Sequence, residues 1–142
     1  MAGKSYLKFT GVLMALIGVA GIVITGVLDL VLGWGISIDH AGIGGTMVMI
    51  IGIAYLVWAA FNLVAGLYGI KYSNDASKAK TCSMFGLISI VIALAVSAWH
   101  LCTLIATTPT APAIISASTG LIVSIIIPVF YLYGALLNTK NN

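Results

Sequence analysis

Charged residues and histidines divide the chain into four long apolar segments. These segments cover residues 9–28, 41–70, 81–99 and 101–139. A helix needs about 20 apolar residues to cross a bilayer core that is about 30 Å thick. The pattern therefore predicts four membrane-spanning helices, at residues 7–31, 45–71, 81–106 and 113–137.

Each predicted span also carries a row of mostly small or polar residues spaced three and four apart. Steps of three and four keep residues on one face of a helix. In lipid, helices associate by close van der Waals approach, so small residues gather where helices touch. We therefore expect an all-α membrane protein, an up-down bundle of four transmembrane helices in one domain, 1–142. The rows are Gly11, Ala15, Gly18, Ile22, Thr25 and Asp29; Gly52, Tyr55, Ala59, Asn62, Gly66 and Gly69; Cys82, Gly86, Ser89, Ala93, Ser97 and His100; and Ala117, Gly120, Ser124, Pro128, Tyr131, Ala135 and Asn138.

Composition supports a membrane protein. Hydrophobic residues make up 61% of the chain and charged residues only 6%, whereas soluble domains contain about 25% charged residues. The predicted connections, 32–44, 72–80 and 107–112, are too short to form a soluble domain. We expect an integral, multi-pass protein of the plasma membrane whose nearest partners are lipids.

The basic residues predict the orientation of the bundle. All six are lysines, and with four spans they fall on one side of the membrane; they are Lys4, Lys8, Lys71, Lys78, Lys80 and Lys140. An excess of Lys and Arg marks cytoplasmic segments, so the N- and C-termini should be cytoplasmic. The net charge of +3 is explained by this bias, and without a basic run interleaved with aromatic residues it does not indicate nucleic-acid binding.

Two ionisable side chains should lie at the same depth near the outer boundary. Asp29 follows Lys8 by 21 residues and His100 follows Lys80 by 20, so both lie about 30 Å from the lysines. Both end their rows of small residues. We expect His100 to face Asp29 across the outer mouth of the bundle, because an inward carboxylate requires a partner in this environment. The alternative is that both residues simply mark helix ends in contact with water.

Other polar residues are candidates for contact with a ligand or partner. Asn62 lies near the midplane, and Ser89 and Ser124 lie at comparable depth, so a three-way polar contact could line a narrow path. Such groups more often join helices by hydrogen bonds of about 1 kcal/mol. In the glycine-rich outer loop, Trp34 and His40 are candidates for contacting a partner.

Reactive groups are sparse. Cys82 and Cys102 are 20 residues apart on one helix, so about 30 Å separates them and they cannot form a disulfide with each other. No spacing typical of metal ligands is present, although Asp39, His40 and Cys102 have suitable chemistry. We therefore expect no metal, no cofactor and no enzymatic activity.

Three functional hypotheses remain. The first is a non-catalytic module that assembles with itself or with another membrane protein, as rows of small residues suggest. In that case Gly18→Leu or Gly66→Leu should change the oligomeric state. The second is a small oligomeric channel or transporter with a polar path through Asn62 and Ser124 and an Asp29–His100 mouth. The third, an intramembrane enzyme, has the least support, because no nucleophile and base stand out.

Overall fold

The computed structural model describes residues 2–26, 43–107 and 110–139. In these residues it contains four long helices, each apolar enough to cross a membrane. A short 3-10 helix, η2 (Ala76–Lys78), precedes the third of them. The prediction of four long helices apolar enough to cross a membrane is confirmed, and these helices extend a few residues beyond most of the expected ends. They are α1 (Ala2–Ile24), α3 (Ile43–Tyr72), α4 (Ala79–Thr107) and α5 (Ala111–Thr139).

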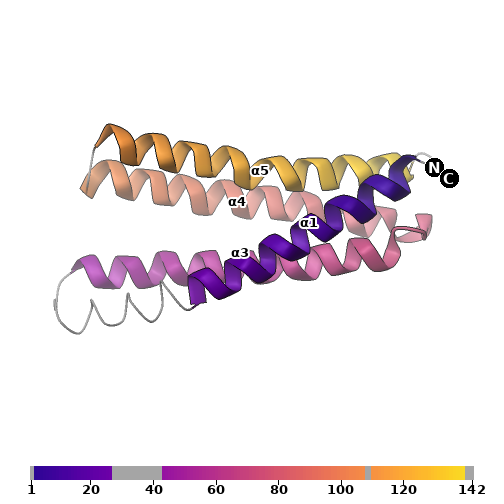
Figure 1. The fold of residues 1–142 in the computed structure, drawn as a ribbon, viewed down its shortest axis with the longest axis horizontal. Coiled ribbons are helices and arrows are strands. Elements are labelled where there is room, and N and C mark those ends of the chain that lie inside the picture. Colours follow the sequence, from indigo (N-terminus) through magenta and orange to yellow (C-terminus); the bar gives the residue numbers. More distant parts are fainter. Residues whose placement is uncertain (1, 27–42, 108–109, 140–142) are drawn as a thin grey trace.

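Successive helices run in opposite directions, and α1 crosses the bundle diagonally (Figure 1). Near the chain termini α1 lies against α5, and at its other end it lies against α3. The closest pairs are α1 with α3 and α4 with α5, and α3 packs more loosely on α4. The cyclic order is therefore α3, α1, α5, α4.

Glycines bring α1 and α3 into backbone contact. A Cβ atom added to Gly18 would lie 2.5 Å from the backbone nitrogen of Leu63, and one added to Gly66 would lie 2.5 Å from the nitrogen of Ala15. Both glycines therefore serve the packing within one chain. Substitution at Gly18 or Gly66 would disturb the packing of helices within one chain. A change of oligomeric state in Gly18→Leu or Gly66→Leu would therefore not show that these glycines form contacts between chains.

The half of the bundle near the termini is densely packed. A Cβ on Gly3 would lie 2.6 Å from the backbone of Asn138, and one on Gly134 would lie 2.9 Å from that of Leu7, so α1 and α5 touch closely here. The ring of Tyr131 on α5 is fully buried. Its hydroxyl donates a 2.8 Å hydrogen bond to the carbonyl of Ala65, which joins α5 to α3.

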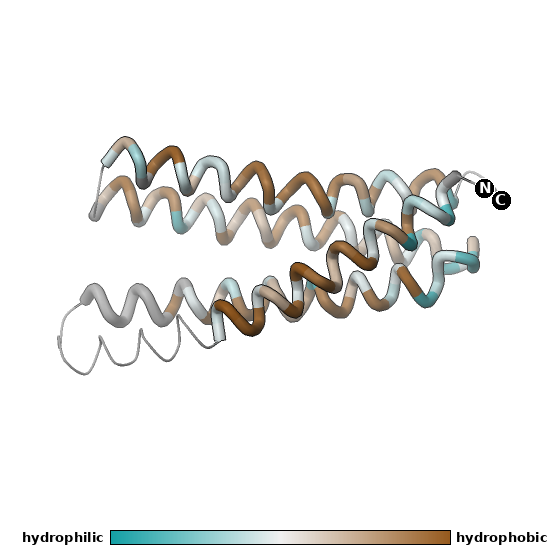
Figure 2. The backbone as a smooth tube through the Cα atoms, viewed as in Figure 1, coloured by the Kyte–Doolittle hydropathy of each residue, from teal (hydrophilic) through white to brown (hydrophobic). Residues whose placement is uncertain are grey.

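The predicted inner faces are largely confirmed by burial. Nearly all the row residues of α3 and α4 that the structure describes are buried or half-buried, whereas on α5 Gly120 is exposed. The opposite faces carry large apolar side chains, and Leu16, Val57, Leu87 and Ile122 are each more than half exposed. Hydrophobic segments extend along all four helices (Figure 2). This is the inverse of a soluble bundle and suits a lipid environment.

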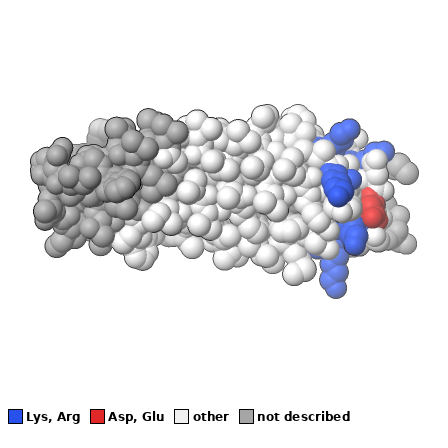
Figure 3. Space-filling view, turned by 90° about the horizontal axis from the view of Figure 1, so that it is seen from below, with Lys and Arg blue, Asp and Glu red and all other residues white. Residues whose placement is uncertain are grey.

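The described lysines gather at one end of the molecule, as Figure 3 shows. At this end Asp75 begins η2: its carboxylate accepts hydrogen bonds from the backbone nitrogen of Ser77, at 2.9 Å, and from its hydroxyl, at 2.6 Å. The hydroxyl bond is the main reason that the pKa of Asp75 lies below its ordinary value. The turn from α3 to α4 is thus capped locally. We call this end of the bundle the lysine end.

We predict that Gly66→Val destabilises the bundle. The new side chain would meet backbone atoms of Gly11 and Ala15, which cannot move aside without separating α1 from α3. Overpacking of this kind costs about 1–3 kcal/mol, so the thermal midpoint in detergent should fall. Gly120→Ala is the matched control, because no atom lies within 4 Å of its added Cβ. Equal midpoints for Gly66→Val and the wild type would contradict close packing of α1 on α3.

Candidate functional site

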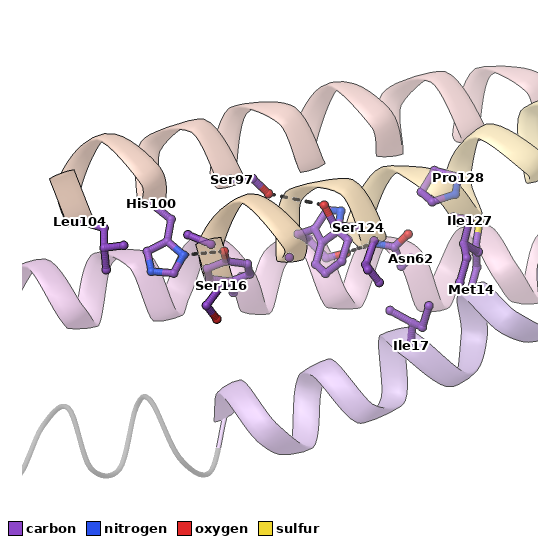
Figure 4. Close-up of a pocket in the computed structure, with 15 residues that line it drawn as sticks. Met14, Ile17, Asn62, Ser97, His100, Leu104, Ser116, Ser124, Ile127 and Pro128 are labelled. Atoms are coloured by element: carbon purple, nitrogen blue, oxygen red, sulfur yellow. Dashed lines mark hydrogen bonds between the residues drawn. The ribbon is translucent and has the colours of Figure 1, made fainter. Parts of the chain in front are cut away.

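A cavity of about 550 Å³ lies between the four helices, in the half remote from the lysine end. Figure 4 shows it from the side, with Ser97 of α4 next to Ser124 of α5 and His100 further along α4, towards Leu104. Its described lining comes from α1 (Met14, Ile17), α3 (Tyr55, Trp58, Asn62), α4 (Ser97, His100, Leu104) and α5 (Ser116, Ala117, Gly120, Val123, Ser124, Ile127, Pro128).

The diagonal course of α1 explains why the cavity lies in this half. At the lysine end α1 contacts α5 through Gly3 and Gly134, but at its other end it contacts α3 through Gly18 and Gly21. As α1 leaves α5, the space between them widens. Two α1 residues, Met14 and Ile17, line the resulting cavity.

One polar wall of the cavity is formed by α3 and α4. At the level most remote from the lysine end, the Tyr55 hydroxyl and His100 Nδ1 are 3.1 Å apart, which is hydrogen-bonding distance. Their rings meet edge to face, with centroids 5.9 Å apart and an interplanar angle of 88°. This pair ties the two most loosely packed neighbouring helices together beside the cavity.

A second polar pair lies deeper, at Asn62. Its amide Nδ2 donates to the carbonyl of Trp58 at 2.8 Å, and its Oδ1 accepts a 2.7 Å bond from the hydroxyl of Ser89. Asn62 is 1% exposed and Ser89 is fully buried. Because both ends of the amide are engaged, its orientation is fixed, and it closes the floor of the cavity.

Between these two pairs lie Ser97 on α4 and Trp58 on α3. The Ser97 hydroxyl is 3.5 Å from that of Ser124, a long distance for a hydrogen bond between hydroxyls. Ser124 donates its own proton to the carbonyl of Leu121 at 2.8 Å. The indole Nε1 of Trp58 is buried and has no hydrogen-bond partner among the described residues.

The part of the α5 wall that is most remote from the lysine end is made of small side chains. Ser116, Ala117 and Gly120 line the cavity within about one turn. A Cβ atom added to Gly120 would have no neighbour within 4 Å, so space remains beside this residue. Within the described lining there is no Lys, Asp or Glu. The cavity is therefore apolar with a few hydrogen-bonding groups.

Three predicted site residues, His100, Asn62 and Ser124, line this cavity. Of the three residues considered for a shared polar contact, Asn62 bonds Ser89, whereas Ser124 lies beside Ser97. Asp29, Trp34 and His40 lie outside the described residues, so the Asp29–His100 contact stays a prediction. In the described structure His100 is next to Tyr55.

Sequence reasoning missed the roles of Tyr55, Trp58 and Gly120. Tyr55 and Gly120 belong to the predicted rows of small or polar residues, but the pattern did not indicate that the helices separate there to form a cavity. Pro128 is fully buried within a continuous α5. The hydroxyl of Ser124, one turn before Pro128, donates to the carbonyl of Leu121.

Neither cysteine contributes to this cavity. Cys82 is buried and Cys102 exposed, and both are free thiols. In the described ranges, no three side chains of His, Cys, Asp or Glu come together in a way that could hold a metal ion. The chemistry available at the cavity is hydrogen bonding and apolar contact.

We predict that Asn62 and Ser89 are energetically coupled. Asn62→Ala and Ser89→Ala should each lower the stability in detergent, and the double variant should lose less than the sum. Couplings across membrane helices average about 0.6 kcal/mol and reach about 1.7. Asn62→Ala combined with Ser83→Ala is the control, because Ser83 bonds only its local carbonyl at Lys80 in the described structure. Strict additivity for Asn62 and Ser89 would contradict the hydrogen bond between them.

Comparison with known proteins adds no assignment to this geometry. No family model, curated protein or solved structure matches the chain. The function is therefore inferred from the cavity and the exposed surfaces.

Proposed function

We propose that this membrane protein binds a small molecule, without catalysing a reaction, in the cavity between its four helices. The observation that carries the proposal is a space of about 550 Å³ lined by apolar side chains and a few convergent polar ones. Ligand sites usually have volumes of about 300–1,000 Å³ and this kind of lining. Storage, sensing and carriage across the membrane all begin with such a binding step.

The dense lysine end favours a binding site over an open channel. Tyr131, Leu7 and Cys82 are fully buried in one apolar cluster there, and the Tyr131 hydroxyl is held by Ala65. A continuous path through Asn62 and Ser124 would have to displace this cluster. Transport would therefore require a rearrangement of the helices around a bound molecule.

We predict that Gly120→Phe prevents binding by filling the cavity. Gly120 lines the cavity and has room for a side chain, so the variant should still fold. Protein purified in lipid nanodiscs would be analysed by mass spectrometry for retained small molecules. The wild type should retain one that Gly120→Phe lacks.

Ile122→Phe is the matched control for this experiment, because Ile122 is 58% exposed on the same helix and lies outside the cavity lining. It should retain the molecule found with the wild type. An empty wild-type protein, or the same molecule in all three preparations, would contradict the proposal.

We propose further that the lysine end faces the cytoplasm and that the protein resides in the plasma membrane. The support is the cluster of lysines at that end, which follows the positive-inside rule. A thiol introduced by Ser77→Cys, in a background with both native cysteines changed to Ala, should react with an impermeant maleimide only after the cells are opened. Reaction in intact cells would reverse the orientation.

Assembly is a second candidate function, favoured by an exposed groove. Ile50 and Ala54 of α3 and Ala95, Val96 and Trp99 of α4 enclose about 300 Å³ on the outside of the bundle. Trp99 is 55% exposed, and the two alanines would let a helix of a second copy, or of another membrane protein, approach closely.

We predict that Ala95→Phe lowers the proportion of oligomer, or removes a co-purifying membrane protein, by filling this groove. The masses of the complexes would be measured by light scattering in detergent and by cross-linking in lipid. Leu87→Phe, on the same helix and outside the groove, should behave as the wild type. A wild type that is monomeric in both media would exclude self-association.

A further inference from the structure

The facing surfaces of α3 and α4 carry polar groups at three successive levels. The first level is the Tyr55–His100 pair and the third is the Asn62–Ser89 pair. Trp58 follows Tyr55 by three residues and Ser97 precedes His100 by three. Because the helices are antiparallel, both steps move about 4.5 Å in the same direction. Trp58 and Ser97 therefore form the middle level, and both line the cavity.

The middle level has two donors whose hydrogen bonds are weak or missing. Ser97 is 8% exposed, and the described contact of its hydroxyl is the long one to Ser124, at 3.5 Å. Trp58 Nε1 is buried without a partner among the described residues. Buried donors in proteins are nearly always paired. The Ser97 hydroxyl lines the cavity and is therefore suited to an acceptor that a ligand supplies, whereas Trp58 Nε1 is covered by protein atoms.

The charge of the lining restricts the ligand further. Among the described lining residues there is no Lys, Asp or Glu to pair with an ionic ligand, and the ionisable imidazole of His100 already has its Nδ1 at hydrogen-bonding distance from the Tyr55 hydroxyl. Moving a charge into such a site without a counter-charge is strongly unfavourable. The ligand that fits is uncharged.

The position of the opening indicates where the ligand comes from. On α5, Val123 is 56% exposed and Gly120 is also exposed, although both line the cavity. They lie where α1 has separated from α5, on the side of the bundle that is otherwise covered with exposed apolar residues such as Ile122. Such a site is reached from the acyl chains of the membrane.

We infer that the cavity binds a neutral, lipid-soluble molecule through a hydrogen-bond acceptor such as a carbonyl oxygen, to which the Ser97 hydroxyl donates. This inference rests on the proposed binding function and specifies its ligand class. The apolar body of the molecule lies against Met14, Ile17 and the small residues of α5, and its acceptor is directed to the middle level.

Three brominated probes test the inference by quenching the fluorescence of Trp58. They are para-bromophenyl octyl ketone, para-bromo-nonylbenzene, which lacks an acceptor, and 9-(para-bromophenyl)nonanoate, a carboxylate that is anionic at neutral pH. The protein would carry Trp34→Phe and Trp99→Phe in nanodiscs, so that Trp58 is the reporter. A protein with Trp99 as its one tryptophan reports quenching from bulk lipid, because Trp99 is outside the cavity lining.

The ketone should quench Trp58 saturably, with an affinity about fivefold higher than that of the alkylbenzene, as expected for one hydrogen bond. Ser97→Ala should remove most of this preference. Ser83→Ala, which deletes a hydroxyl of the same helix outside the cavity lining, should leave it unchanged. Gly120→Phe should abolish saturable quenching, whereas Ile122→Phe should not.

Equal affinities for the ketone and the alkylbenzene, or tighter binding of the anion, would overturn the inference. If the probes quenched Trp58 saturably without the expected preference, and Gly120→Phe still abolished that quenching, the proposed binding function would stand and only the ligand class would be wrong. An absence of saturable quenching by any probe would also overturn the ligand class, and the molecules retained by the purified wild type would then decide the binding function separately.

Discussion

The backbone contact between α1 and α3 determines the rest of this architecture. In lipid, burial of apolar surface does not drive helices together, so they associate where backbones can approach closely. Gly18 and Gly66 permit such an approach over the middle of both helices. Because the same helix is also held against α5 at Gly3 and Gly134, it must cross the bundle. The cavity results from that crossing.

The two halves of the bundle thereby acquire different properties. In the lysine half, Tyr131 fills the centre and the helices are packed side chain to side chain. In the other half, α3 and α4 are joined by hydrogen-bonding pairs at Tyr55–His100 and Asn62–Ser89. Hydrogen bonds fix the register of two helices without filling the space beside them. This half can therefore be both ordered and hollow.

The sequence predicts which face of each helix is turned into the bundle better than it predicts the angles at which the helices cross. The spacing of Gly66, Asn62 and Ser89 placed these residues inside the bundle, because a helical period follows directly from position in the chain. Nothing in that period specifies a crossing angle, so the separation of α1 from α5 was not foreseen. The pairing of His100 with Asp29 was expected from their equal depth and from their positions at the ends of two rows of small residues. It stays a prediction, because Asp29 lies outside the described residues.

The openness around Gly120 has a consequence for how this protein can change over evolutionary time. A Cβ atom added to Gly66, which holds two helices together, would meet the backbone of α1, whereas one added to Gly120 would meet no other described part of the chain within 4 Å. Replacement of Gly120 by Ala, Ser or Val would shrink the hollow by small steps and leave the helix contacts intact. The size of molecule accepted can therefore drift, or be engineered, independently of the ability of the chain to fold.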